Sequence, residues 1–231
     1  PTCSSTLLGI NDNLTFLGYR EYRLATEDGE DMLVPVPGSG LGILSPDVQP
    51  EASSSRSFAA LPPAVRALAR EPKLLVLSKA NSRSTVHRST YLDYIGVKTF
   101  DADGNVVGEK RFLGLYSSSA YTQSILDIPI LRNKYEHLIV DLGYAAGSHN
   151  AKDLLQFLET YPRDELFQTH DSMLSGIAGS VLHLQERRQT KLYLRPDDYR
   201  RFMSCLVYLP RDRYTTAVRL RIERLLMQAF G

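Results

Sequence analysis

The chain has 231 residues, and its contents of 43% hydrophobic and 23% charged residues are those of an ordinary globular protein. Its formal net charge of +1 gives no reason to expect that the chain as a whole binds nucleic acid or a membrane surface through its charge. No apolar stretch approaches the roughly 20 residues that a membrane-spanning helix needs. The two cysteines, Cys3 and Cys205, lie far apart and fit a reducing compartment better than a disulfide framework. The composition therefore predicts a cytoplasmic protein of one or two domains.

Strand patterns dominate the first part of the chain, as short stretches rich in β-branched and aromatic residues. Strands are expected at 14–24, 32–36, 74–77, 91–100 and 106–116. The last two form a hairpin, because the segment 101–105 between them supplies Asp and Asn side chains that cap backbone amides and a glycine that tolerates positive φ. A Ser- and Pro-rich segment, 45–57, precedes a short expected helix at 61–70.

A polar and basic loop, 79–88, comes after the third strand. It carries four cationic or ionisable donors, Lys79, Arg83, His87 and Arg88, among small hydroxyl and amide residues. Arginine presents a fork of donors that matches a carboxylate or a phosphate, so these residues are the candidate anion-binding site. The competing interpretation, which is the commoner outcome for a basic loop, is a solvated segment whose cations pair with neighbouring acidic residues.

Three helices are expected after the strands, at 128–142, from about 148 to 161, and at 171–188. Gly143 is a stop signal for the first of them. Either Ser148 or Asn150 can cap the second, and Pro162 lies just past its end. These helices separate the strand-rich part of the chain from its C-terminal part.

The C-terminal part has a strand–strand–helix pattern, at 191–194, 202–209 and 214–230. Such a unit cannot bury the apolar stripe of its helix without further strands, so it is expected to be part of a larger module. From Arg188 onward, ten Lys or Arg residues face four Asp or Glu residues. With Tyr208 and Tyr214 available for stacking, this local basic bias leaves RNA binding as an alternative.

Motifs for catalysis or metal binding are missing from the sequence. The glycines at 38, 40 and 42 do not match Gly-x-Gly-x-x-Gly, and the five histidines show no metal spacing. There is no HExxH, CxxC, Gly-x-Ser-x-Gly or P-loop motif. We therefore expect no catalytic residue, no metal and no bound cofactor in this chain. Because it begins without Met, we also expect it to be a fragment of a longer protein.

Several long stretches are similar to the large bacterial NAD-specific glutamate dehydrogenases, in that family's order. They are the segments 14–22, 74–121, 154–168 and 202–226. The resemblance implies a parent enzyme that oxidises L-glutamate with NAD to 2-oxoglutarate and ammonia and assembles as a homo-oligomer. It also implies that the catalytic region lies downstream. The family's catalytic lysine and nucleotide-binding glycines have no counterpart in this chain.

The same resemblance implies an α+β fold made of regulatory modules: an antiparallel PAS-like domain at 1–145, a helical connector at 146–189, and the start of an ACT-like βαβ module at 190–231. The leading hypothesis is an N-terminal regulatory and oligomerisation fragment. Its partners would be the rest of the polypeptide, other subunits and a small-molecule effector. The alternatives are a free-standing sensor that binds an amino acid or anion at 79–88, and RNA binding by the basic C-terminal region.

Overall fold

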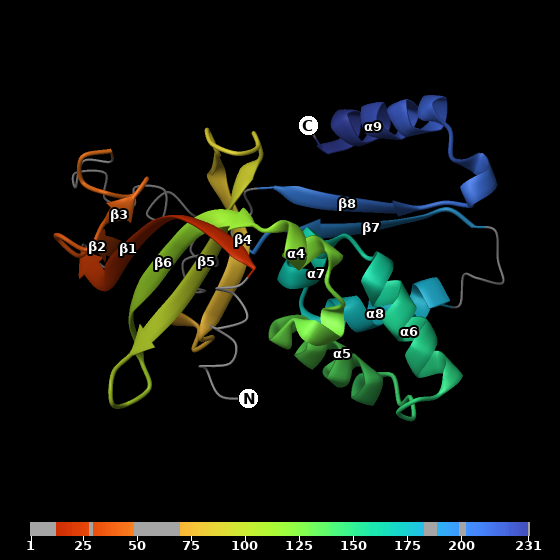
Figure 1. The fold of residues 1–231 in the computed structure, drawn as a ribbon, viewed down its shortest axis with the longest axis horizontal. Helices are drawn as coiled ribbons and strands as arrows, with labels where there is room; N and C mark the ends of the chain where they lie inside the picture. The colour runs from red at the N-terminus through yellow and green to blue at the C-terminus, as the bar shows by residue number, and fades with distance from the viewer. Residues whose placement is uncertain (1–12, 28–29, 49–69, 183–188, 199–201, 231) are drawn as a thin grey trace. The chain divides into compact units, whose positions relative to one another are not determined.

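The structure is a computed structural model that describes residues 13–27, 30–48, 70–182, 189–198 and 202–230 (Figure 1). The chain divides into two compact units, Pro1–Gln123 and Ser124–Gly231. The first is built mainly of strands and the second mainly of helices. In the described part of the chain, no helix is long and apolar enough to cross a membrane.

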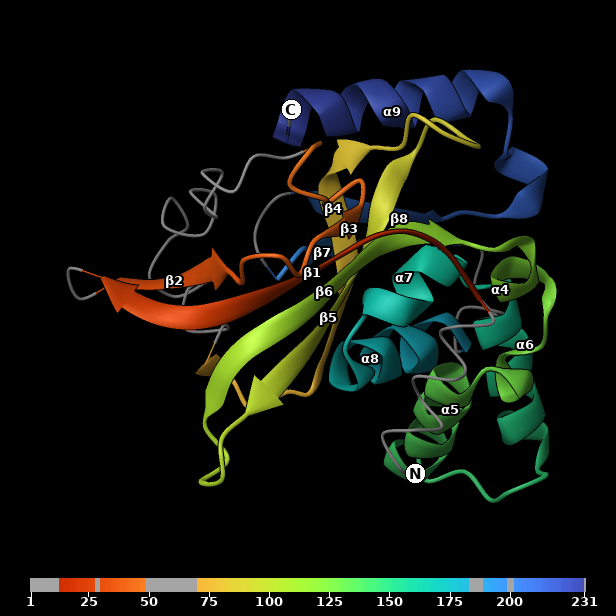
Figure 2. The same ribbon diagram turned by 60° about the vertical axis from the view of Figure 1, so that its left-hand side comes forward.

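One antiparallel sheet forms the first unit (Figure 2). Its strands are β1 (Leu14–Glu27), β2 (Glu30–Pro35), β3 (Leu41–Gly42), β4 (Leu75–Arg83), β5 (Tyr91–Phe100) and β6 (Val106–Tyr116). Their order is β2-β1-β6-β5-β4, with β3 paired to β1. The first and last strands of the unit, β1 and β6, therefore lie side by side in the middle of the sheet.

The expected strands are all present, and the β5–β6 hairpin has the expected bounds. One expectation about the candidate site was wrong, because β4 continues through Arg83 and the segment Lys79–Arg83 belongs to a strand. The last residues of β4 are polar and exposed, which hides a strand from pattern analysis. Most of the helix expected at 61–70 lies outside the described residues.

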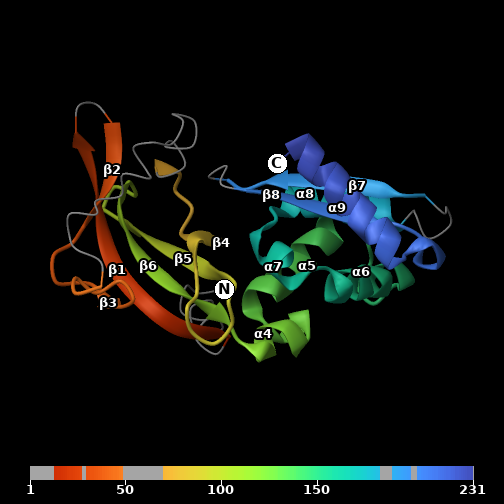
Figure 3. The ribbon, with the colours of Figure 1, turned by 90° about the horizontal axis from the view of Figure 1, so that it is seen from above.

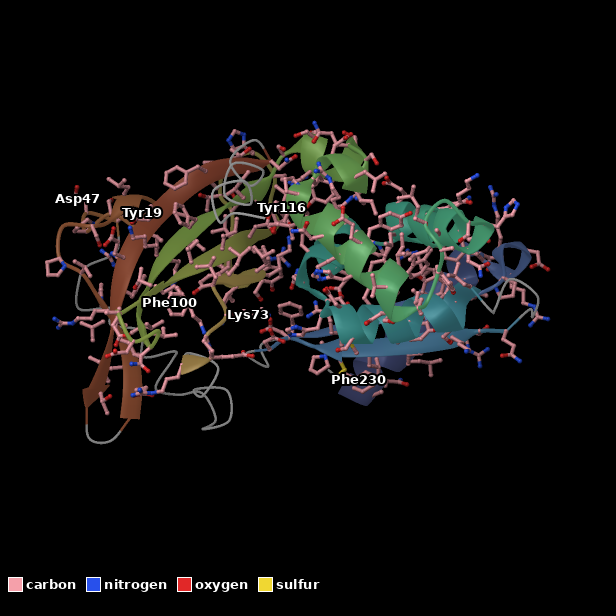
Figure 4. The ribbon with its side chains drawn as sticks, turned by 90° about the horizontal axis from the view of Figure 1, so that it is seen from below. Tyr19, Asp47, Lys73, Phe100, Tyr116 and Phe230 are labelled. Carbon is pink, nitrogen blue, oxygen red and sulfur yellow. The ribbon has the colours of Figure 1, made fainter. Side chains whose placement is uncertain are left out.

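The two faces of this sheet differ in burial. Side chains alternate between the faces of a strand, and the more buried face carries Arg20, Tyr22, Val76, Ser78, Tyr94, Lys98, Glu109, Leu113 and Leu115. On the other face Phe16 is 49% exposed, and its ring packs edge-on against Phe112, with 6.5 Å between centroids. The ring of Tyr19, labelled in Figure 4, lies on the same face, with 5.0 Å between its centroid and that of Phe112.

Four helices form the helical layer of the second unit: α5 (Pro129–Asp141), α6 (His149–Thr160), α7 (Arg163–Gln168) and α8 (Asp171–Leu182). Helices α5, α6 and α8 pack on one another, and α5 also contacts α7. Leucines from three helices are fully buried between them, at 131, 138, 154, 158 and 174. Burial of these side chains is the main driving force for this helical layer.

Local signals set the ends of these helices as expected. The hydroxyl of Ser148 accepts a hydrogen bond from the Ala151 amide at 3.2 Å and so caps α6, and Gly143 comes after α5 with φ of +67°. Two short helices were not expected. They are α7 and α4 (Ser118–Thr122), the latter in the first unit, and both are too short to show a helical period.

The second unit ends with a hairpin and a long helix. The hairpin pairs β7 (Lys191–Pro196) with β8 (Met203–Tyr208) in antiparallel register. After a short 3-10 turn, η3 (Arg211–Arg213), helix α9 (Thr216–Phe230) crosses over the hairpin at an angle (Figure 3). No residue of α9 is buried. Apolar side chains such as Leu225 and Met227 remain 55% and 67% exposed.

Candidate functional site

The basic segment predicted as an anion site contains one buried ion pair. Lys79 Nζ lies 2.5 Å from Asp93 Oδ1 on the neighbouring strand, and Asp93 is only 1% exposed. The other carboxylate oxygen of Asp93 accepts a hydrogen bond from the amide of Tyr116 at 2.8 Å. Lys79 therefore balances a buried carboxylate that fastens β5 to the end of β6.

Arg88 has partners within the chain as well. Its guanidinium donates to the carbonyl oxygen of Tyr116 at 2.7 Å and lies 5.2 Å from the ring centroid of Tyr121. Tyr116, labelled in Figure 4, is thus held by Asp93 through its amide and by Arg88 through its carbonyl. Arg88 joins the loop before β5 to the end of β6.

Arg83 and His87 are exposed, as Arg88 is. Arg83 stacks over the ring of Tyr91, with 4.9 Å from Cζ to the centroid, and His87 has a left-handed φ of +62° in a turn closed by the hydrogen bond from Ser84 N–H to Thr90 O. Lys79 Nζ also lies 5.9 Å from the ring centroid of Tyr116, so Lys79 and Arg88 both contact Tyr116, whereas Arg83 contacts Tyr91. An anion site at these residues stays a prediction, with Arg83, His87 and Arg88 as its exposed donors.

A second polar group lies on the buried face of the sheet. The guanidinium of Arg111 lies between two tyrosine rings, 4.0 Å from the centroid of Tyr22 and 5.1 Å from that of Tyr94. Glu109 accepts a hydrogen bond from Arg111 Nε at 3.3 Å and another from the hydroxyl of Tyr94. We call Tyr22, Tyr94, Glu109 and Arg111 the tyrosine–arginine cluster.

Electrostatics keeps Arg111 charged. Burial lowers the pKa of Arg111, but the attraction of Tyr94, Glu109 and Tyr22 outweighs it and the net pKa is raised. Nearby on the same face, burial lowers the pKa of Lys98, whose ammonium donates to the carbonyl of Glu71 at 2.7 Å. The arrangement is that of a satisfied polar core, in which each charge has neutralising neighbours.

Space for the cluster depends on a glycine. A Cβ atom at Gly96 would come within 2.9 Å of the Glu109 carboxyl carbon and of one of its oxygens. The sequence held a signal for this buried cluster, because Glu109 and Arg111 alternate along β6 in step with the apolar Leu113 and Leu115. That alternation places both charges on the buried face.

A third polar group lies in the second unit, between the helices and the hairpin. Arg195 on β7 donates two hydrogen bonds to Glu165 on α7, at 2.8 and 2.9 Å. Burial lowers the pKa of Arg195, but the attraction of Glu165, Asp197 and Asp198 together outweighs it and the net pKa is raised. Lys191, at the other end of β7, donates to Ser180 of α8 at 2.6 Å. Strand β7 is thus fastened to the helical layer near both of its ends.

The basic side chains near the C-terminus are exposed, at 211, 213, 219, 221 and 224. Arg219 pairs with Glu223 on the same helix at 3.3 Å. Cys205 lies half-buried in β8 with a free thiol. Among the residues that the structure describes, no three His, Cys, Asp or Glu side chains gather where they could hold a metal ion.

The fold is mixed α/β and consists of two units. The first unit is an antiparallel sheet, and the second is a helical layer followed by a β-hairpin and a helix. Two family models match the second unit. The glutamate dehydrogenase helical motif 1 matches residues 128–187, and the glutamate dehydrogenase ACT2 domain matches residues 191–231.

Three relatives extend the match to almost the whole chain, and all are named NAD-specific glutamate dehydrogenase. The proteins of Halomonas elongata and Pseudomonas aeruginosa are each 38% identical, and that of Mycobacterium tuberculosis is 36% identical, over 219 residues or 95% of this chain. The chain spans only 14%, 13% and 12% of these relatives, respectively. It therefore belongs with the large NAD-specific glutamate dehydrogenases, as a relative of their N-terminal region.

Proposed function

We propose that this chain supplies regulation and subunit assembly to a larger NAD-dependent glutamate dehydrogenase, whose chemistry takes place in another part of the polypeptide. The observation that carries the proposal is 38% identity over 95% of the chain to a small part of enzymes with that name. The parent enzyme would convert L-glutamate and NAD to 2-oxoglutarate and ammonia in the cytoplasm. NAD would be bound by its catalytic region rather than by this chain.

The proposed organisation has three parts, with a PAS-like module first. In chain order, and leaving out the short β3, the sheet order β2-β1-β6-β5-β4 is 2-1-5-4-3. This places the first and last strands at the centre and leaves a long connection between the second and third strands, as a PAS-like sheet requires. We place the end of this module near residue 123, where the compact units divide, rather than at residue 145.

The helical connector then begins before α5, since the helical-motif model matches from residue 128. The last part, from about residue 190, supplies the opening of an ACT-like module. The exposed apolar side chains of α9 support this assignment, because an amphipathic helix of an α/β module packs its apolar side on a sheet. Further strands of the same polypeptide would cover that side.

Enzyme assays test the proposal directly. The purified chain, given L-glutamate and NAD, should form no NADH, whereas the full-length Pseudomonas aeruginosa relative in the same assay should form it. Deleting the matching segment from that relative should alter its oligomeric state, measured by light scattering, or its response to effectors. Turnover by the isolated chain would refute the proposal, and so would a deletion that changes neither property.

A further inference from the structure

One face of strand β7 makes the contacts between the hairpin and the helical layer. Residues at alternate positions of a strand share a face, and Lys191, Tyr193 and Arg195 occupy three such positions. Lys191 reaches Ser180 on α8 and Arg195 reaches Glu165 on α7. These two anchors are four residues apart along β7, or roughly 13 Å at the usual rise of a strand.

The two anchors differ in strength and geometry. Lys191 offers one ammonium to one hydroxyl, whereas the Arg195 guanidinium meets both oxygens of the Glu165 carboxylate and also donates to the Gln168 side chain at 3.3 Å. The Arg195 and Glu165 side chains are only 9% and 16% exposed. A bidentate, charge-assisted pair fixes orientation as well as distance, so Arg195 restrains how α7 and β7 turn relative to each other.

The surroundings of this pair are aromatic and confined. Arg195 lies 5.9 Å from the ring centroid of Phe202, just before β8. Tyr193 and Tyr208 pack edge to face with 5.7 Å between centroids. A third link, after the end of β7, joins His170, between α7 and α8, to Asp198 at 3.3 Å, but both side chains are exposed. The Arg195–Glu165 pair is thus the most enclosed of these links.

We propose that Arg195 is a positioning residue that makes helix α7 and the β7–β8 hairpin move as one body, so that a disturbance in the hairpin reaches the helical layer through Glu165. The inference deepens the regulatory role proposed above and rests on it for its biological meaning. An ACT-like module that began at this hairpin would then report its state to the helices mainly through the most enclosed of these links, the Arg195–Glu165 pair.

Hydrogen exchange by mass spectrometry on the whole 231-residue chain tests the coupling. The disturbance is Val207→Ala in β8, because Val207 points to the face of the hairpin opposite Arg195 and touches neither partner of the pair. In the otherwise unchanged chain, this substitution should raise exchange about threefold or more in both the hairpin and α7. In an Arg195→Met/Glu165→Met background, it should raise exchange in the hairpin alone.

A matched control uses an exposed pair in the same unit. In an Arg219→Met/Glu223→Met background, Val207→Ala should again raise exchange in α7, because that pair lies within α9 and spans no two elements. Unchanged exchange in α5 and α6 checks that each variant is folded. The proposal is refuted if Val207→Ala never affects α7, or if it affects α7 equally with and without Arg195 and Glu165. The readout needs no glutamate, NAD or effector, so either refutation leaves the proposed function standing.

Discussion

The Arg111 guanidinium lies 4.0 Å from the ring centroid of Tyr22, and this contact joins the two central strands of the first unit. Cation–π contacts strengthen when both groups are shielded from water, and Tyr22 is only 7% exposed. The middle of the sheet is therefore held by a polar group where a sheet core normally has aliphatic side chains. Its stability depends on every member being present, because a half-satisfied buried network is costly.

Arg111→Met should destabilise the first unit by about 3 kcal/mol, because it removes the cation that donates a hydrogen bond to the buried Glu109 carboxylate. Hydrogen exchange at the amides of β5 and β6 measures this loss without interference from the second unit. Lys110→Met is the matched control on the same strand, since its side chain is 47% exposed and its ammonium lies 3.9 Å from the Glu21 carboxylate. We expect a change within about 0.5 kcal/mol for the control. Equal effects of the two variants would contradict the structural role of the cluster.

Local chemistry explains which parts of the fold could be predicted from the sequence. In the β5–β6 turn, one carboxylate oxygen of Asp101 accepts hydrogen bonds from the amides of Asp103 and Asn105 at 3.0 and 2.8 Å, and Gly104 has φ of +84°. These interactions lie within a single short turn, so the sequence alone specifies them. The cap of α6 by Ser148 is of the same kind.

Long-range pairing explains what could not be predicted. The sequence placed Lys79 in a loop and could not name its acidic partner, because Asp93 belongs to the next strand and meets Lys79 only after β4 and β5 pair. The Arg195–Glu165 pair joins residues 30 apart in the sequence. Helix α7, which supplies Glu165, has six residues and no measurable period. Neither contact leaves a local signal.

The predicted anion site can be tested at Arg83. A thermal-shift series with inorganic phosphate, amino acids and 2-oxoglutarate should give a dose-dependent rise in Tm if the segment is a sensor, and Arg83→Ala should abolish it while changing the basal Tm little, since Arg83 is exposed. Arg88→Ala is a poorer probe, because it removes the bond to the Tyr116 carbonyl and should lower the basal Tm by itself. Arg23→Ala, another exposed arginine in the same sheet, is the control. A series without any shift would contradict the sensor hypothesis and favour scaffolding.

Acid should weaken the second unit through Glu159. Burial raises the pKa of this carboxyl, but hydrogen bonds from the Ser124 hydroxyl, the Ile125 amide and Arg163 outweigh it and hold the pKa below the ordinary value of 4.5. The Glu159 carboxyl binds a proton more readily in the unfolded chain than in the folded chain. Its contribution to the free energy of unfolding is therefore complete above pH 4.5 and is lost as the pH falls through the lower pKa of the folded state.

The measurement is the Tm of the chain between about pH 6 and pH 3, compared with that of Glu159→Gln. The variant should be less stable at neutral pH, and the difference between the two proteins should shrink toward acid pH. Glu136→Gln, exposed on α5, should match the unchanged chain throughout. A constant difference between Glu159→Gln and the unchanged chain at all pH values would show that the carboxylate's charge is not what stabilises the start of the unit.

Removing the Tyr193 hydroxyl should stabilise the joint between the hairpin and the helices. This oxygen is buried and has no hydrogen-bond partner among the described residues, and burying an unpaired hydroxyl costs about 1–3 kcal/mol. Tyr193→Phe keeps the ring contact with Tyr208 and should stabilise β7 and β8 by about 1 kcal/mol in hydrogen-exchange measurements. Tyr161→Phe is the matched control with the opposite expected sign, because the Tyr161 hydroxyl shares a hydrogen bond with Thr169. Loss of that hydrogen bond should destabilise the same region by a similar amount. If Tyr193→Phe destabilised β7 and β8 instead, the hydroxyl of Tyr193 would have a hydrogen-bond partner such as a buried water. The prediction of an unpaired hydroxyl would then be wrong.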